Sequence, residues 1–171
     1  MDKIDQKIAK ALDEQYAAAL KMLENTISQC DKELWQDEKR NPIISQIIYH
    51  TLFFVDYYLS KDDNEKENFK GKLGDDFMGE KTDGKEWNKI YSKTELLEYL
   101  SDIRIKANNL FSNQTLEHLN SPSVFNWHGS TRLSSLMYNL RHIMLHVGAL
   151  HVRLNEVGKE PLKWVSKGSL S

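Results

Sequence analysis

The chain has 171 residues, of which 40% are hydrophobic and 28% are charged, and its formal net charge is −2 with neutral histidines. This length suits one domain around a single core, and the composition is too apolar for a disordered chain. Basic and acidic residues alternate without a concentrated basic stretch, which argues against nucleic-acid binding.

The sequence has no predicted disulfide, signal peptide or membrane span. Cys30 is the only cysteine, so no intramolecular disulfide can form. No stretch approaches the roughly 18 apolar residues of a membrane span, and the first ten residues lack the apolar core of a signal peptide. We therefore expect a cytoplasmic, single-domain protein over residues 1–171 that has no membrane association.

The first predicted helix covers about residues 2–28. Apolar side chains recur there every three or four positions, at Ile4, Ile8, Leu12, Tyr16, Ala19, Leu23 and Ile27. This spacing is typical of a long amphipathic helix. The second predicted helix covers about residues 41–60, because Asn41 is a capping residue, Pro42 suits the first helical position, and an apolar run follows directly.

Residues 61–91 are rich in Lys, Asp and Gly, and the glycines interrupt any helical period. The stretch is therefore predicted to be a long connection, of a length that is uncommon unless it carries function or disorder. Its large apolar side chains indicate that it packs somewhere, either as a surface crossover or as a lid. These side chains are Phe69, Phe77, Met78 and Trp87.

The third predicted helix covers about residues 92–113 and begins with a capping box formed by Ser92 and Glu95. The fourth covers about residues 130–158, with Ser130 as its cap and Gly158 as its stop signal. Four helices with one long crossover, and no competing strand pattern, predict an all-α fold of the four-helix-bundle type.

Two histidines of the fourth helix, His142 and His146, are four residues apart and therefore share one helix face. They flank the apolar stripe of that helix, and His50 lies at the edge of the stripe of the second helix. The spacing of the pair is equally compatible with packing and with metal ligation. A single histidine such as His50 is, by itself, more typical of half-buried packing.

Other polar residues near these flanks have predicted roles as well. His118 and His128 are interpreted as surface residues, with the alternative that His128 reaches the mouth of the groove. His151 points away from His146 around the helix, so it is excluded as a ligand. Four residues share the flanks of the three histidines and are candidates for supporting the ligands or contacting a substrate. They are Gln46, Tyr57, Asn139 and Arg153.

The last helix reads N-L-R-H-I-M-L-H-V-G-A-L, followed by N-E-V-G-K-E-P-L-K-W, and the second helix contains I-I-Y-H-T-L-F-F-V-D. These segments resemble the DinB-like (DinB/YfiT-type) superfamily of four-helix-bundle metalloproteins, and the resemblance covers essentially the whole chain. It implies that His50, His142 and His146 bind one divalent metal ion, which is Zn, Ni, Mn or Fe among relatives. It also implies a homodimer.

Three histidine ligands leave a coordination position for water or substrate, as in catalytic metal sites. The resemblance thus implies a metal-dependent hydrolase that uses metal-bound water, or a transferase that uses a low-molecular-weight thiol held as thiolate. Its partner would be a small-molecule substrate or thiol. The zincin motif H-E-x-x-H is absent, since Ile143 follows His142, and so is the Glu-x-x-His pattern of di-iron bundles. The alternative is a non-catalytic stress-response or interaction bundle, with or without bound metal.

Overall fold

The structure is a computed structural model that describes residues 3–74 and 89–170. Within these residues it is all-helical, with seven α-helices, one short 3-10 helix and no strand. Four of the helices are long: α1 (Lys3–Gln29), α3 (Ile44–Tyr58), α5 (Lys93–Ser112) and α7 (Arg132–Glu156). The all-α class predicted from the sequence is confirmed.

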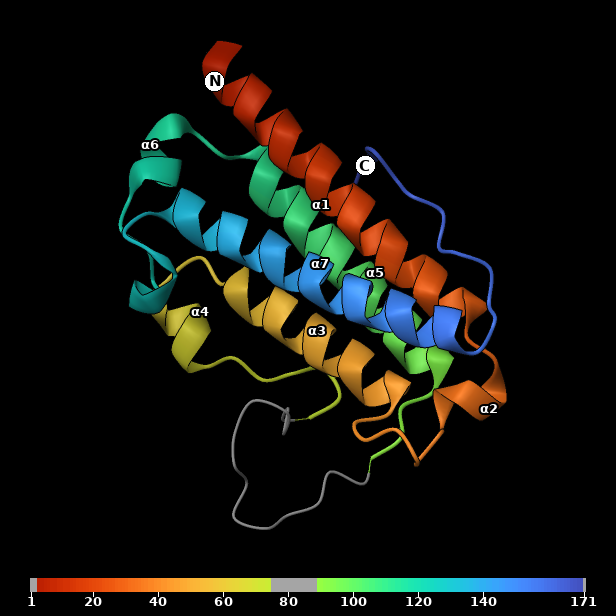
Figure 1. Ribbon diagram of the computed structural model, residues 1–171. Helices are drawn as coiled ribbons and strands as arrows, with labels where there is room; N and C mark the ends of the chain where they lie inside the picture. Colours follow the sequence, from red (N-terminus) through yellow and green to blue (C-terminus); the bar gives the residue numbers. More distant parts are fainter. Residues whose placement is uncertain (1–2, 75–88, 171) are drawn as a thin grey trace.

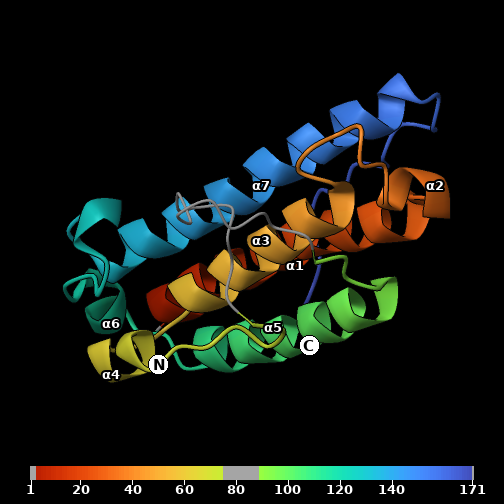
Figure 2. The same cartoon turned by 90° about the horizontal axis from the view of Figure 1, so that it is seen from below.

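The four long helices lie side by side (Figure 1). α1 packs against α5 and α7, and α3 packs against the same two helices. Viewed from below, α7 and α5 lie on opposite sides of α1 and α3 (Figure 2). Each long helix therefore turns one face into a shared core, which is the arrangement that the apolar periodicity requires.

The short helices cover the ends of this array. α2 (Lys32–Trp35) lies at one end, and α4 (Asp63–Glu67) and α6 (Leu116–Asn120) lie at the other (Figures 1 and 2). The 3-10 helix η1 (Asn126–His128) precedes α7. No helix among residues 3–74 and 89–170 has the length and apolar character needed to cross a lipid bilayer.

Aliphatic and aromatic side chains from all four long helices fill the core. Tyr16 of α1 is fully buried, and its hydroxyl donates a hydrogen bond to the carbonyl of Leu136 on α7 at 2.7 Å. Cys30 is also buried, as expected for a free cysteine used in packing. Further core residues from α3, α5 and α7 include Ile48, Leu52, Leu96, Ile103, Ile143 and Leu150.

The predicted start of α5 is confirmed. The hydroxyl of Ser92 accepts a hydrogen bond from the backbone N–H of Glu95 at 3.2 Å, and the Glu95 carboxylate accepts one from the Ser92 N–H at 2.8 Å. These reciprocal bonds satisfy backbone donors that a helix N-terminus leaves without partners.

The prediction that Ser130 caps α7 is wrong by one residue. The cap is Thr131, whose hydroxyl accepts a hydrogen bond from the Ser134 N–H at 3.2 Å. Ser130 is not available for this role because its carbonyl accepts a hydrogen bond from Ser123 at 3.2 Å, beside a short antiparallel bridge between Pro122 and Thr131. At the other end α7 stops before Gly158, which has a positive φ of 74°, as predicted.

The predicted start of α3 is also wrong. Asn41 and Pro42 precede the helix and are joined by a cis peptide bond, and α3 begins at Ile44. The capping contact comes from inside the helix, where the side-chain oxygen of Gln46 accepts a hydrogen bond from the backbone N–H of Ile43 at 3.1 Å. The Asn-Pro pair therefore forms part of the turn and not the first helical residues.

The described part of the connection over residues 61–91 contains the short helix α4. The prediction of a connection without helical period missed this helix. Asp62 caps α4 by accepting a hydrogen bond from the Glu65 N–H at 2.8 Å. Phe69 packs against Phe53 and Tyr57 of α3, with ring centroids 5.1 Å away in both cases, as expected for a packed connection. The predictions for Phe77, Met78 and Trp87, and with them the lid alternative, lie outside the described residues.

Candidate metal centre

Three hydrogen bonds align α7 with α3 along their length. They join the side chain of Arg132 to the carbonyl of Ser60, that of Asn139 to Val55, and that of Arg153 to Pro42. Residue numbers rise along α7 as they fall along α3, so the two helices are antiparallel. This register places His50 of α3 opposite the turn of α7 that carries His142 and His146.

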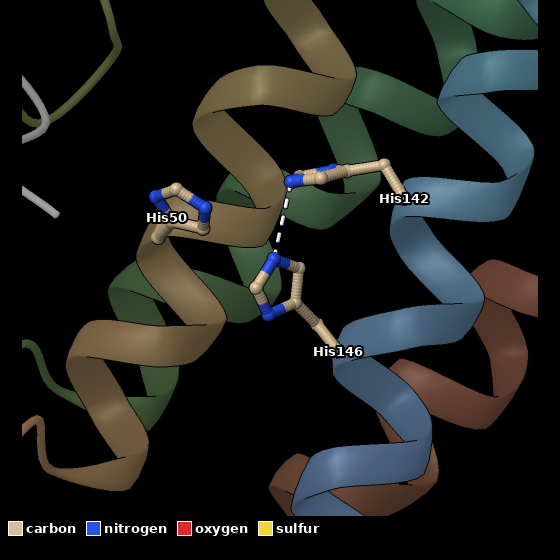
Figure 3. A group of neighbouring side chains, drawn as sticks. All are labelled: His50, His142 and His146. Carbon is tan, nitrogen blue, oxygen red and sulfur yellow. Dashed lines mark hydrogen bonds between the residues drawn. The ribbon is translucent and has the colours of Figure 1, made fainter. Parts of the chain in front are cut away.

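The three imidazoles meet in the space between the two helices (Figure 3). His50, His142 and His146 each offer a ring nitrogen, and these nitrogens all lie within 4.8 Å of one another. The Nε2 atoms of His142 and His146 are 3.1 Å apart. Two imidazole nitrogens bound tetrahedrally to one zinc ion are separated by roughly 3.3 Å. The His142 and His146 nitrogens therefore have a spacing close to that of two ligands of one ion, and the group of three could hold a single first-row divalent ion.

The electrostatic environment keeps His142 neutral. Burial, followed by the neighbouring His146, His50 and His128, lowers the pKa of His142 to about 3. A metal ligand must be a neutral imidazole, so this state suits coordination. The Nδ1 atom of His142 is buried and has no hydrogen-bond partner among the described residues, whereas its Nε2 faces His146 and is the nitrogen presented to the centre of the group.

Aromatic rings wall one side of the three histidines. The ring of Phe54 lies 4.8 Å from that of His50 and 5.8 Å from that of His142, and Tyr58 lies 5.9 Å from His142. Burial, with Tyr138 next in size, raises the pKa of Tyr58, so its hydroxyl stays protonated. This wall lowers the local dielectric and strengthens electrostatic interactions inside the site. The F-F-x-x-Y-Y run on α3 is the sequence signal for these rings, but aromatic residues are not metal ligands and the histidine spacing does not point to them.

The four polar residues predicted to support the site have different surroundings. Asn139 is fully buried, and together with Arg153 it aligns α7 with α3, so both position the histidine pair against His50. Gln46 caps α3, and the ring of Tyr57 packs against Phe125 at 5.0 Å. Direct contact of any of the four with a substrate stays a prediction.

The prediction that His128 is a surface residue is wrong. Its side chain is only 8% exposed and stacks on Tyr138 at 3.8 Å, with Tyr58 edge-on at 4.3 Å. Both ring nitrogens are buried without a hydrogen-bond partner among the described residues. Burial, followed by the charge of Arg141, lowers the pKa of His128 to about 4. His118, by contrast, is exposed as predicted.

Comparisons with known proteins leave the site to be interpreted from its own geometry. No protein-family model, no curated protein and no solved structure matches the chain. The function is therefore argued from the three imidazoles, their burial and their aromatic surroundings.

Proposed function

We propose that the protein is a DinB-like four-helix bundle that binds one divalent metal ion through His50, His142 and His146 and uses it as a hydrolase or a low-molecular-weight-thiol S-transferase. The single observation that supports this most is the convergence of three ring nitrogens from two helices within 4.8 Å. Chance packing rarely places three imidazoles in one partly buried space, since each carries polar atoms that need partners.

The donor set favours an open site over a closed structural one. Structural zinc sites have four protein ligands, whereas three histidines leave room for a water or a substrate. A divalent ion held there would act as a Lewis acid and would increase the acidity of a water or thiol bound to it. Three imidazoles suit Zn, Ni, Mn or Fe, and affinity order alone does not select one of them.

The chain's own residues have separable tasks in this proposal. His142 and His146 form the rigid half of the site because they lie one turn apart on α7. Phe54 and Tyr58 exclude water from one side and offer an apolar surface to a substrate. The cytoplasmic location and the homodimer remain predictions and are not needed for the chemistry.

Elemental analysis of protein purified without a metal-affinity tag tests the metal site. We expect about one ion per chain in the wild type and a loss of at least about tenfold in metal affinity in His50→Ala. His118→Ala is the matched control, because that histidine is exposed and lies outside the group. A metal-free wild type with an unchanged melting temperature after zinc addition would overturn the proposal and favour a non-catalytic interaction bundle.

Activity assays then separate the two reactions. The metal-loaded protein is incubated with small amides, and separately with a low-molecular-weight thiol plus an electrophile. Turnover in one assay that disappears in His142→Ala but persists in His118→Ala would identify the reaction. Equal turnover in wild type and His142→Ala would refute catalysis at this site.

A further inference from the structure

A cavity lined by none of the three histidines lies at the end of the array that carries α4 and α6, the two short helices seen in Figures 1 and 2. Its volume is about 840 Å³, within the range of pockets that hold small molecules. The segment after α3, the helices α4 and α6, the second half of α5 and the first residue of α7 line it. None of the three candidate metal ligands contributes to it.

Arg132 is the most unusual residue of this cavity. It is only 5% exposed, and its guanidinium donates hydrogen bonds to the carbonyls of Ser60 and, at 3.2 Å, of Leu59. It forms no ion pair with any carboxylate in the part of the chain that the structure describes. The two carbonyls at the end of α3 offset part of its charge, but a buried cation is normally paired with an anion.

The acids that line the cavity are paired with lysines, and only the more distant charge of Glu65 acts on Arg132. Glu65 is bound by Lys106, with 2.9 Å between carboxylate and ammonium, and Asp102 is bound by Lys72. Both acids that line the cavity are therefore already paired with a lysine, and Lys106 pairs with Asp56 as well, at 2.8 Å. Lys61 also lines the cavity and adds positive charge at its rim. The cavity thus presents an excess of positive charge to a ligand.

A second polar group without a partner lines the same cavity. Gln114 is only 5% exposed, and its side-chain oxygen is buried without a hydrogen-bond partner among the described residues. A buried acceptor left in this state costs about 1–3 kcal/mol, and a ligand hydroxyl would satisfy it. Leu59, Ile105 and Leu110 complete the lining with aliphatic surface that suits a short carbon chain.

We propose that this cavity binds a small hydroxycarboxylate, whose carboxylate pairs with Arg132 and whose hydroxyl donates to the side-chain oxygen of Gln114. The ligand supplies the anion that the buried guanidinium lacks and the donor that the buried amide lacks. This site is independent of the metal centre and does not depend on the proposed reaction.

Calorimetric titration of the full chain with L-malate tests the proposal. The protein is first treated with EDTA and dialysed, because hydroxycarboxylates also bind metal ions. We expect a dissociation constant of about 1 mM for malate, at least about fivefold weaker binding of succinate, which lacks the hydroxyl and leaves the buried acceptor without a partner, and no binding of the uncharged diamide of malate. His50→Ala should bind malate like the wild type, which separates this cavity from the metal centre.

Variants locate the binding. Arg132→Gln should weaken malate binding by at least about tenfold, since a charge-assisted contact is lost. Gln114→Met should abolish the preference for malate over succinate while leaving the melting temperature nearly unchanged, so it remains informative if Arg132→Gln fails to fold. Lys163→Gln, on the exposed C-terminal segment, is the control. Absence of malate binding, equal binding of the diamide, or an unchanged malate preference in Gln114→Met would each overturn the proposal.

Discussion

Replacement of His128 by phenylalanine probes whether a buried neutral imidazole makes the protein sensitive to acid. Phenylalanine preserves the stacking on Tyr138 and removes both ring nitrogens that have no partner. In the wild type, burial lowers the pKa of His128 from its ordinary value of 6.5 to about 4. The unfolded chain therefore binds a proton at a pH where the folded chain does not.

The sign and size of the effect follow from this difference. Because the pKa of His128 is lower in the folded state, its contribution to stability is complete above pH 6.5 and is lost as the pH falls towards 4. Between pH 7 and pH 5 the loss is about 2 kcal/mol for this one residue. His128→Phe should lack this component, while its stability at pH 7 should stay within about 1 kcal/mol of the wild type.

Urea denaturation of EDTA-treated protein at pH 7 and pH 5 measures the difference. Titrating groups that do not interact with His128 contribute equally to both proteins and cancel when the two losses are subtracted, whereas His142 cancels only in part because His128 contributes to lowering its pKa. His118→Phe is the matched control, because that histidine is exposed. If wild type and His128→Phe lose the same free energy of unfolding between the two pH values, the imidazole is not held neutral by burial and the reasoning fails.

Three further predictions concern the free energy of unfolding, measured by chemical denaturation. Leu150→Ala should lower it by about 2–5 kcal/mol because the side chain is fully buried. Leu145→Ala, on the exposed face of the same helix, is the control and should change it by less than about 0.5 kcal/mol. Equal losses in the two variants would contradict the packing. Tyr99→Phe should cost about 1–2 kcal/mol, since the hydroxyl donates to the Asp56 carboxylate at 2.8 Å, and no loss would mean that the bond is absent. Ser92→Ala should cost about 1 kcal/mol through the lost cap of α5, with faster amide exchange in the first turn as the second readout.

The start of a helix was predictable from the sequence where only one residue could accept hydrogen bonds from the first backbone N–H groups. Ser92 and Glu95 lie three residues apart and cap each other, so the start of α5 follows from local sequence. The start of α7 offered two adjacent hydroxyl residues, and pairing of the Ser130 carbonyl with Ser123 left Thr131 as the cap. That choice depends on a neighbouring segment and is not encoded in the helix itself.

Burial of polar residues was the weakest part of the prediction. His128 follows a tryptophan and precedes a glycine, a context that is typical of a surface turn. The residue is buried because Tyr58 and Tyr138, from two other elements, close around it. Arg132 is likewise buried because the end of α3 lies against its guanidinium, a contact that the local sequence does not predict. Side-chain chemistry alone does not predict which surfaces meet.

The sequence by itself determined the all-helical class, the approximate extent of the four long helices and the shared face of His142 and His146, because apolar periodicity and four-residue spacing act within one helix. Only the tertiary structure decided that His50 joins them, since the antiparallel alignment of α3 with α7 depends on contacts between segments far apart in the chain. The same packing formed the cavity lined by Arg132 and left this residue without a carboxylate ion pair among the residues that the structure describes. No local sequence pattern predicts this, because it depends on which surfaces of the fold meet.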